Sequence, residues 1–99
     1  LLLEALNDSA NEVRAEATSL LGKLYKPNWA IQLLLEKLSD SNSEVRKSAA
    51  LSLMKLKITK SIENLRARET EETDKSVLAV IKLAINQLSK SRKDSNNDF

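Results

Sequence analysis

Four charged residues at a repeated spacing are the first candidates for chemistry in this chain. Asp8 and Arg14 lie six positions apart, and Asp40 and Arg46 repeat the pair later in the sequence. A carboxylate beside a guanidinium could form a catalytic pair, in which one group exchanges a proton and the other binds an anion. A residue required for catalysis, however, is not expected to recur in each unit of a repeat. We therefore predict a structural role for both pairs and no catalytic residue.

The composition excludes several other kinds of site. The sequence contains no cysteine and no histidine, which excludes disulfides, thiolate nucleophiles, Cys/His zinc sites and a Ser-His-Asp relay. We predict no cofactor and no metal. The net charge of +2 is too small to indicate nucleic-acid binding by itself. No apolar run approaches the roughly 18 residues of a membrane span, so we expect no membrane partner and a cytoplasmic location.

The two charged pairs belong to a longer internal repeat. When the sequence is shifted by 32 positions, residues 1–24 align with residues 33–56 without a gap, and 14 of the 24 positions are identical. The identities include Asp, Glu and Arg, which a chance likeness between two amphipathic helices would not produce. A third, weaker copy at the same step keeps the aliphatic residues Val77, Ile85 and Leu88. A repeat of this length predicts a solenoid, in which each unit buries its apolar face against its neighbours.

Apolar residues within each unit follow a helical period. Val45, Ala49, Leu53 and Leu56 recur every three or four residues, as the buried face of a helix does. The polar stretch SDSNS before them predicts a turn. We expect helices near residues 1–7, 12–25, 29–39, 44–57, 60–70 and 74–89. The expected N-caps of the second helices are Asn11, Ser43 and Thr73.

These elements predict an all-α, right-handed superhelix of about three helical hairpins. The units are residues 1–25, whose first helix is truncated, residues 26–57 and residues 58–89, followed by a disordered tail at residues 90–99. The third unit has Leu78 where the first two have arginine, and such divergence is typical of a terminal cap. Because the chain begins abruptly with LLLEAL, we expect it to be part of a longer protein with further repeats ahead of it.

The stretch DSANEVRAEATSLLGKL resembles a HEAT repeat, and more narrowly the short bacterial HEAT-like repeat first recognised in phycobilisome lyases. The first unit matches this pattern at Asp8, Val13, Arg14, Ala17, Leu20, Leu21, Gly22 and Leu24. The second unit has Met54 in place of the glycine and matches at Asp40, Val45, Arg46, Ala49, Leu53 and Leu56. The resemblance covers residues 1–89. It is specific for the type of repeat and not for an activity.

The resemblance implies a structural ladder between the units. By analogy with HEAT arrays, Arg14 is expected to reach Asp40 of the next unit, and Arg46 is expected to reach Glu72. A guanidinium can bridge a carboxylate and free helix-terminal groups, and such a bridge fixes the angle between units. We therefore assign Asp8, Arg14, Asp40 and Arg46 to this ladder.

The resemblance also implies that the second helices line the concave side of the array. Basic residues of these helices should make that side mildly basic. The candidate partner-binding residues there are Arg46, Lys47, Leu51, Met54 and Lys55, of which the leucine and the methionine would supply an apolar contact. The alternative is a solvated surface of mixed charge.

Three residues near the first inter-unit turn have expected packing roles. Gly22 should permit the close approach of the next helix, because it has no side chain. Trp29, with Tyr25 close by, should pack across the start of its helix and seal a boundary between layers. The alternative for Trp29 is an anchor for a protein partner.

Three functions remain open from the sequence. We expect a non-catalytic protein-interaction scaffold, which presents its concave surface to a protein partner or to a neighbouring domain of its own chain. The resemblance leaves part of a bilin lyase subunit as the second function. A nucleic-acid-binding HEAT-like module is the third, and it is disfavoured because aromatic residues are not interleaved with the basic ones.

Overall fold

The computed structural model describes residues 2–24 and 28–96, and every regular element in these residues is a helix. The elements are α1 (Leu2–Ala5), α2 (Asn11–Leu21), α3 (Asn28–Lys37), α4 (Ser43–Lys55), the short 3-10 helix η1 (Thr59–Ser61), α5 (Ile62–Glu71) and α6 (Lys75–Asn96). Each proposed unit thus begins with one helix and continues into a second. The prediction of an all-α solenoid is confirmed.

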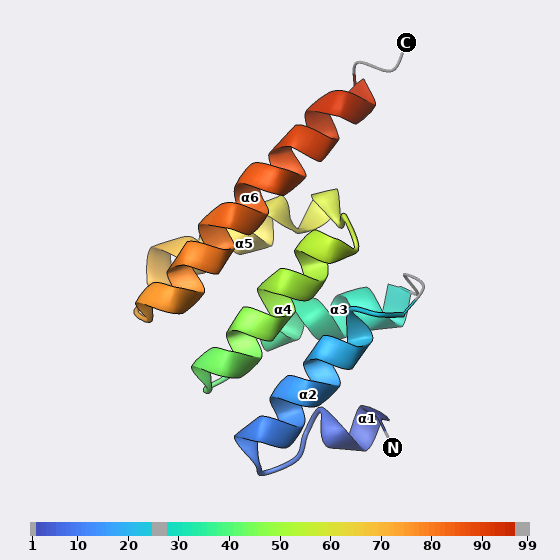
Figure 1. Ribbon diagram of the computed structural model, residues 1–99, viewed down its shortest axis with the longest axis vertical. Coiled ribbons are helices and arrows are strands. Elements are labelled where there is room, and N and C mark those ends of the chain that lie inside the picture. The colour runs from blue at the N-terminus through green and yellow to red at the C-terminus, as the bar shows by residue number, and fades with distance from the viewer. Residues whose placement is uncertain (1, 25–27, 97–99) are drawn as a thin grey trace.

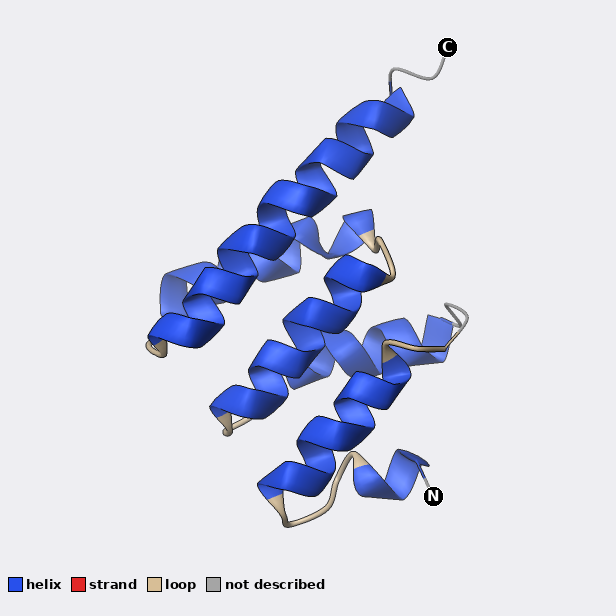
Figure 2. Cartoon of the chain, in the orientation of Figure 1, coloured by secondary structure: helices blue, strands red, loops and turns tan. Residues whose placement is uncertain are grey.

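The helices form a slab two layers thick. The second helices α2, α4 and α6 run side by side, with α3 and α5 behind them (Figure 1). Short loops join the elements (Figure 2). The principal extents of 47 × 30 × 15 Å agree with this arrangement, since one helix with its side chains is about 10 Å wide. Helix α4 packs against α2, α3 and α6, so the middle unit contacts both of its neighbours.

The core lies between the layers and follows the apolar period of the sequence. Leu34 of α3 and Val45, Ala49 and Leu53 of α4 are fully buried. Leu21 of α2, at the position of Leu53, and Val77 of α6, at the position of Val45, are fully buried as well. The one apolar face of each helix therefore supplies the hydrophobic driving force for stacking the units.

The second helices begin with caps that differ from the expected ones by one residue. The Asn42 side chain accepts hydrogen bonds from the backbone N–H groups of Glu44 and Val45, at 2.9 and 3.3 Å. Asp74 accepts in the same way from Ser76 and Val77, at 2.9 and 3.0 Å.

The expectation of Asn11, Ser43 and Thr73 as caps was therefore wrong. The N-cap residue of α2 is Ala10, whose side chain cannot accept a hydrogen bond. The Asn11 side chain accepts instead from the Arg14 guanidinium at 2.7 Å. At α2, the side chain that was expected to cap the helix thus binds the arginine instead.

Helix α6 is longer than expected. It runs to Asn96, so the disordered tail predicted from residue 90 was wrong for residues 90–96, and residues 97–99 lie outside the described part. No glycine or proline interrupts residues 75–96. The Arg92 guanidinium also donates to the Thr59 carbonyl at 3.2 Å, which ties the last turns of α6 to the turn ahead of α5.

Candidate functional site

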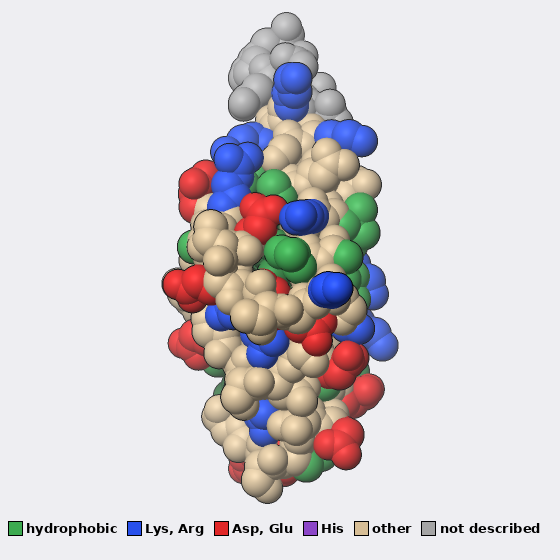
Figure 3. All heavy atoms as spheres, turned by 90° about the vertical axis from the view of Figure 1, so that its left-hand side faces the viewer, with side chains coloured by type: hydrophobic (Ala, Val, Ile, Leu, Met, Phe, Trp, Pro, Cys, Tyr) green, Lys and Arg blue, Asp and Glu red, His purple; other side chains and the backbone are tan. Residues whose placement is uncertain are grey.

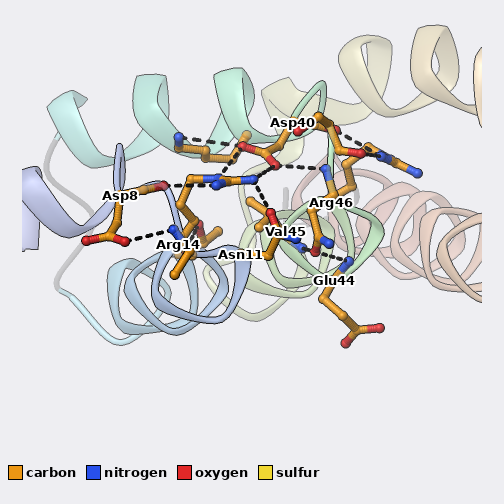
Figure 4. A network of polar contacts seen from close by, with 12 residues as sticks. Asp8, Asn11, Arg14, Asp40, Glu44, Val45 and Arg46 are labelled. Carbon is orange, nitrogen blue, oxygen red and sulfur yellow. Dashed lines mark hydrogen bonds and ion pairs between the residues drawn. The ribbon is translucent and has the colours of Figure 1, made fainter.

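Arg14 joins the turn of its own unit to the turn of the next unit. Its Nε and Nη2 atoms each lie 3.1 Å from one oxygen of the Asp40 carboxylate. Its Nη1 atom donates to the carbonyls of Asp8 and Ser9, at 2.9 and 3.3 Å. Figure 4 shows the guanidinium lying between Asp8 and Asp40. The contact expected between Arg14 and Asp40 is therefore present.

Arg46 repeats this geometry one unit further along. Its Nε and Nη2 atoms donate to the two oxygens of Glu72, both at 2.8 Å. Its Nη1 atom donates to the carbonyls of Asp40 and Ser41, at 2.9 and 3.1 Å. The two-pronged pairing of a planar guanidinium with a carboxylate fixes both distance and orientation. We name this set of contacts the ladder, comprising Asp8, Arg14, Asp40, Arg46 and Glu72.

Each carboxylate of the ladder accepts from a backbone N–H group, and those of Asp40 and Glu72 bind arginine as well. Asp40 accepts from the Asn42 N–H at 2.9 Å, and Glu72 accepts from the Asp74 N–H at 3.1 Å. Arg68 adds a second cation to Glu72, with Nε 3.3 Å from Oε1. Asp8 accepts from the Ala10 N–H at 2.8 Å. Each turn of the three units thus orients its carboxylate in the same way.

Both paired carboxyl groups stay ionised because their partners outweigh burial. Burial by itself raises the pKa of Asp40, but hydrogen bonds from the Arg14 guanidinium and the Asn42 N–H lower it below its usual value. The pKa of Glu72 is lowered in the same way, since the Arg46 guanidinium and the Asp74 N–H together exceed the cost of burial. Carboxylates with depressed pKa values suit ion pairing rather than proton transfer near neutral pH.

Gly22, which directly follows α2, lies close against Ser52 of α4. A Cβ atom added to Gly22 would lie 2.3 Å from Ser52 Oγ and 3.1 Å from Ser52 Cα. Ser52 is buried, and its hydroxyl donates to the Thr18 carbonyl at 3.3 Å. The expected role of Gly22 in helix approach therefore agrees with this geometry.

The five candidate partner-binding residues do not form one exposed patch. Only 11% of the Arg46 side chain is exposed, and its donors are engaged in the ladder, so the assignment of Arg46 to partner binding was wrong. Lys47 is partly exposed and pairs with Glu44 at 3.2 Å. Leu51 and Met54 are half-buried, whereas Lys55 is exposed.

The surface of the second helices changes character along the array. A groove of about 490 Å³ between α2 and α4 is lined by three carboxylates, by small polar residues and by one alanine, namely Asn11, Glu12, Ala15, Glu16, Ser19, Asn42, Glu44 and Ser48. Figure 3, which faces the left-hand side of Figure 1, shows that acidic side chains prevail toward its lower end and basic ones toward its upper end. The mildly basic surface expected here was wrong for this groove, because the helical turn sends Arg14 and Arg46 inward and the glutamates outward.

A second groove, between α4 and α6, has an apolar floor. It measures about 230 Å³ and is lined by Met54, Lys57, Leu83, Gln87, Leu88 and Ser91. Leu83 is 46% exposed, and sequence reasoning missed it. The available signal was the period itself, because Leu83 lies 32 positions after Leu51. We call Leu51, Met54, Lys55, Lys57 and Leu83 the α4–α6 surface.

Trp29 does not have the sealed position expected for it. It lies in the first turn of α3 and is 50% exposed. Tyr25, its expected neighbour, lies outside the described residues.

No helix in the described residues is long and apolar enough to cross a membrane. The same residues hold no group of three or more acidic, cysteine or histidine side chains arranged to bind a metal ion.

Comparison with known proteins agrees with the repeat architecture. A family model described as HEAT repeats matches residues 1–90. The "Bilin biosynthesis protein MpeU" of Synechococcus sp. (strain WH8020) is 44% identical over 90 residues. These residues make up 91% of this chain and 30% of that protein, so the chain spans less than a third of this relative. The chain belongs to the HEAT-repeat family.

Proposed function

We propose that this chain is a non-catalytic scaffold segment that binds another protein, or a neighbouring domain of a longer protein, through the α4–α6 surface. The observation that carries the proposal is that the polar residues that join the units are separate from the residues that line the exposed grooves. Arg14, Asp40, Arg46 and Glu72 hold the units together through the ladder. Most positions that line the exposed grooves differ between units and are available for a partner, although Glu12 and Glu44 are identical.

The chemistry of the α4–α6 surface indicates the kind of partner that it fits. Met54 and Leu83 line the groove with apolar side chains, and the exposed Lys57 lines it too. The exposed Lys55 is the last residue of α4 and follows Met54 in the sequence. An apolar anchor with a rim of charges is the usual composition of a protein-binding patch. We therefore propose a protein segment that inserts an apolar side chain into the groove and carries carboxylates for the two lysines. A cytoplasmic location remains part of this proposal.

A pull-down with paired variants tests the proposal. Leu83→Ser removes the most exposed of the apolar side chains that line the groove, and Leu20→Ser makes the same change at a leucine of similar exposure on α2. Lys55→Glu and Lys60→Glu form a second pair, because both lysines are exposed and only Lys55 belongs to the α4–α6 surface. Proteins retained by the immobilised chain are identified by mass spectrometry.

We expect the Leu83→Ser and Lys55→Glu variants to lose the same specific partner, while the Leu20→Ser and Lys60→Glu variants keep it. Truncating a central apolar contact of an interface commonly costs a factor of about ten or more in affinity. Equal retention by all four variants would contradict binding at the α4–α6 surface.

A role in bilin biosynthesis, as part of a longer protein, is the second candidate function. It is supported by the 44% identity to a protein named for bilin biosynthesis. The chain has neither cysteine nor histidine, so thiolate or imidazole chemistry in such a protein would come from other segments. Titration of a bilin into the chain, followed by visible absorption, tests this candidate. A shifted and saturable bilin spectrum would favour it, and an unchanged spectrum at high chain concentration would count against a bilin site in these residues.

Binding of duplex DNA along the second helices is disfavoured by the α2–α4 groove. Glu12, Glu16 and Glu44 line it, and carboxylates repel the phosphates that dominate the affinity of such complexes.

A further inference from the structure

Equivalent residues of the three units differ sharply in exposure at the N-terminal side of the array. Val13, Val45 and Val77 occupy the same position of the repeat. Val45 and Val77 are 0% exposed, whereas Val13 is 39% exposed. Leu20 is 41% exposed, although its counterpart Ser52 is buried. The difference does not come from residue type, because the valines are identical. It follows from the preceding unit: α2 packs against α4, which carries Val45, and α4 packs against α6, which carries Val77. In the described residues, no helix packs in this way ahead of α2.

In the first unit, the surface that the preceding helix covers in the other two units is exposed and forms an apolar groove. It measures about 550 Å³ and is lined mainly by Leu2, Ala5, Val13, Ala17 and Leu20. We call these five residues the α1–α2 face. Contiguous apolar surface of this kind marks an interaction site more often than an ordinary solvent-facing surface does.

Asp8 lies at this end of the array with the same backbone support as the two carboxylates that bind arginine. It accepts from the N–H two residues ahead at 2.8 Å, as Asp40 does at 2.9 Å and Glu72 does at 3.1 Å. Asp40 and Glu72 each bind the arginine of the preceding unit. Asp8 is exposed, and it stands at the matching point of the 32-residue step.

We propose that the α1–α2 face docks a preceding helix pair of the same repeat type, whose arginine pairs with Asp8. The docked pair would lie one repeat step ahead, with its second helix against α2 as α2 lies against α4. The interface would therefore continue the one already formed between the units, in both its apolar contact and its ion pair. This inference stands independently of the partner proposed for the α4–α6 surface.

A second copy of this chain fits the face poorly. In a head-to-tail contact the copy would present α6, which has Leu78 at the position of Arg14 and Arg46. Lys82 is exposed on α6, and its counterparts Thr18 and Ala50 are small and fully buried. The far end of the array thus lacks the arginine and carries a charge where close packing is required. A repeat unit that has the arginine is the better match.

An extended chain tests the proposal directly. A copy of residues 1–32 is joined ahead of residue 1, which keeps the register because Leu1 occupies the position of Leu33, the residue after Gln32. The added copy of Arg14 would then reach Asp8. A matched control carries glutamine in place of that added arginine. A second version carries Leu20→Ser in the original unit, which places a serine opposite the added glycine, as Ser52 lies opposite Gly22.

We expect the extended chain to unfold at a midpoint at least about 5 °C above that of the 99-residue chain, in one or both versions. Asp8→Asn should lower the unfolding midpoint of the extended chain by about 3 °C or more. The same substitution should lower the midpoint of the glutamine control by much less, and that of the 99-residue chain by about 1 °C or less. Amide exchange of α1 and α2 should slow in the extended chain only.

Three results would overturn the proposal. The first is an added unit that leaves the midpoint and the amide exchange of α1 and α2 unchanged in both versions. The second is an equal effect of Asp8→Asn with and without the added arginine. The third is a dimer of the 99-residue chain in sedimentation that Val13→Ser dissociates, because a second copy would then be the occupant of the face.

Discussion

In each arginine–carboxylate pair of the ladder, the arginine binds its own turn and the turn of the next unit at the same time. Arg14 and Arg46 each donate to two backbone carbonyls of their own turn and to both oxygens of the next carboxylate. Lysine could not replace them, because an ammonium group lacks the planar fork that reaches both sets of acceptors. The residues that first suggested a catalytic pair therefore set the distance between units.

Removing one partner of the Arg46–Glu72 pair should destabilise the fold. The Glu72 side chain is 0% exposed, so Arg46→Met would leave a buried carboxylate with fewer partners and lower the free energy of unfolding by about 2 kcal/mol. The double variant Arg46→Met/Glu72→Met should recover most of this loss, since two apolar side chains leave no buried charge. Urea unfolding of the single and double variants measures the coupling. Additive losses in the double variant would contradict direct pairing.

The depressed pKa values of Asp40 and Glu72 predict the direction of the pH dependence. In the folded chain the pKa of each carboxyl group lies below its ordinary value, which is 3.8 for Asp40 and 4.5 for Glu72. The stabilisation is therefore complete above these values and is lost as the pH falls through the lower folded values.

We expect the urea midpoint to be constant between about pH 7 and 5.5 and to fall below about pH 4.5. The fall should be smaller in the Arg46→Met/Glu72→Met variant, which lacks one of the two groups. A midpoint that rises between pH 5 and pH 3 would contradict the account.

The sequence allowed part of the ladder to be predicted and not the rest. The Arg14–Asp40 pairing followed from the register of the repeat and its resemblance to HEAT arrays. The contacts of Arg14 with the carbonyls of Asp8 and Ser9 depend on the path of the turn backbone, which no side-chain pattern specifies. Arg46 was assigned to two roles because a sequence does not tell whether a helix residue faces the next turn or the solvent.

At the scale of the elements, the spacing of α2 and α4 depends on one glycine. Gly22 has a negative φ of −67°, so another residue could adopt its backbone conformation. Its value lies in the space that a side chain would fill against Ser52. Close contact lets the Ser52 hydroxyl reach the Thr18 carbonyl.

Gly22→Ala should destabilise the chain by about 1–3 kcal/mol, because overpacking at a helix contact forces the helices apart. Combining it with Ser52→Gly should cost less than the sum of the two single changes, since the second change removes the opposing side chain. Thermal unfolding of the three variants measures this. A neutral Gly22→Ala variant would show that the helices are not in close contact at this point.

The end of α4 offers a substitution that should stabilise the chain. Lys57 has a φ of 57°, a left-handed conformation that favours glycine, and it follows the last turn of α4, where the Ile58 N–H donates to the Leu53 carbonyl at 3.1 Å. Lys57→Gly should raise the free energy of unfolding by about 0.5–1 kcal/mol. Lys55→Gly, within the helix, is the matched control and should lower it by about 0.5 kcal/mol. Equal effects in chemical unfolding would contradict the left-handed conformation of Lys57.

Helix positions were easier to predict than helix ends. The six helices followed from the apolar period, because burial of one face repeats every three to four residues. The end of α6 could not be predicted in this way. Its last turns carry polar residues without a periodic pattern, and a contact distant in sequence, from Arg92 to Thr59, anchors them.

At the scale of the whole molecule, the two ends of the array differ. The α1–α2 face is apolar and has a carboxylate oriented for an arginine, whereas α6 has Leu78 and Lys82 at the matching positions. The proposed docking of a preceding repeat unit therefore concerns the α1–α2 face and not α6. Its grooves also differ, with an acidic one between α2 and α4 and an apolar one between α4 and α6. The proposed scaffold function uses this separation, since the apolar groove is the one assigned to the partner.

The most direct test of the scaffold account is a chemical-shift titration of the ¹⁵N-labelled chain with the protein that the wild-type chain retains and the Leu83→Ser variant loses. We expect the largest shifts in the second half of α4 and in the facing residues of α6, around Met54 and Leu83, with the backbone amides of the ladder turns unchanged. Shifts centred on α3 and α5, or on the Arg14–Asp40 and Arg46–Glu72 pairs, would contradict the account.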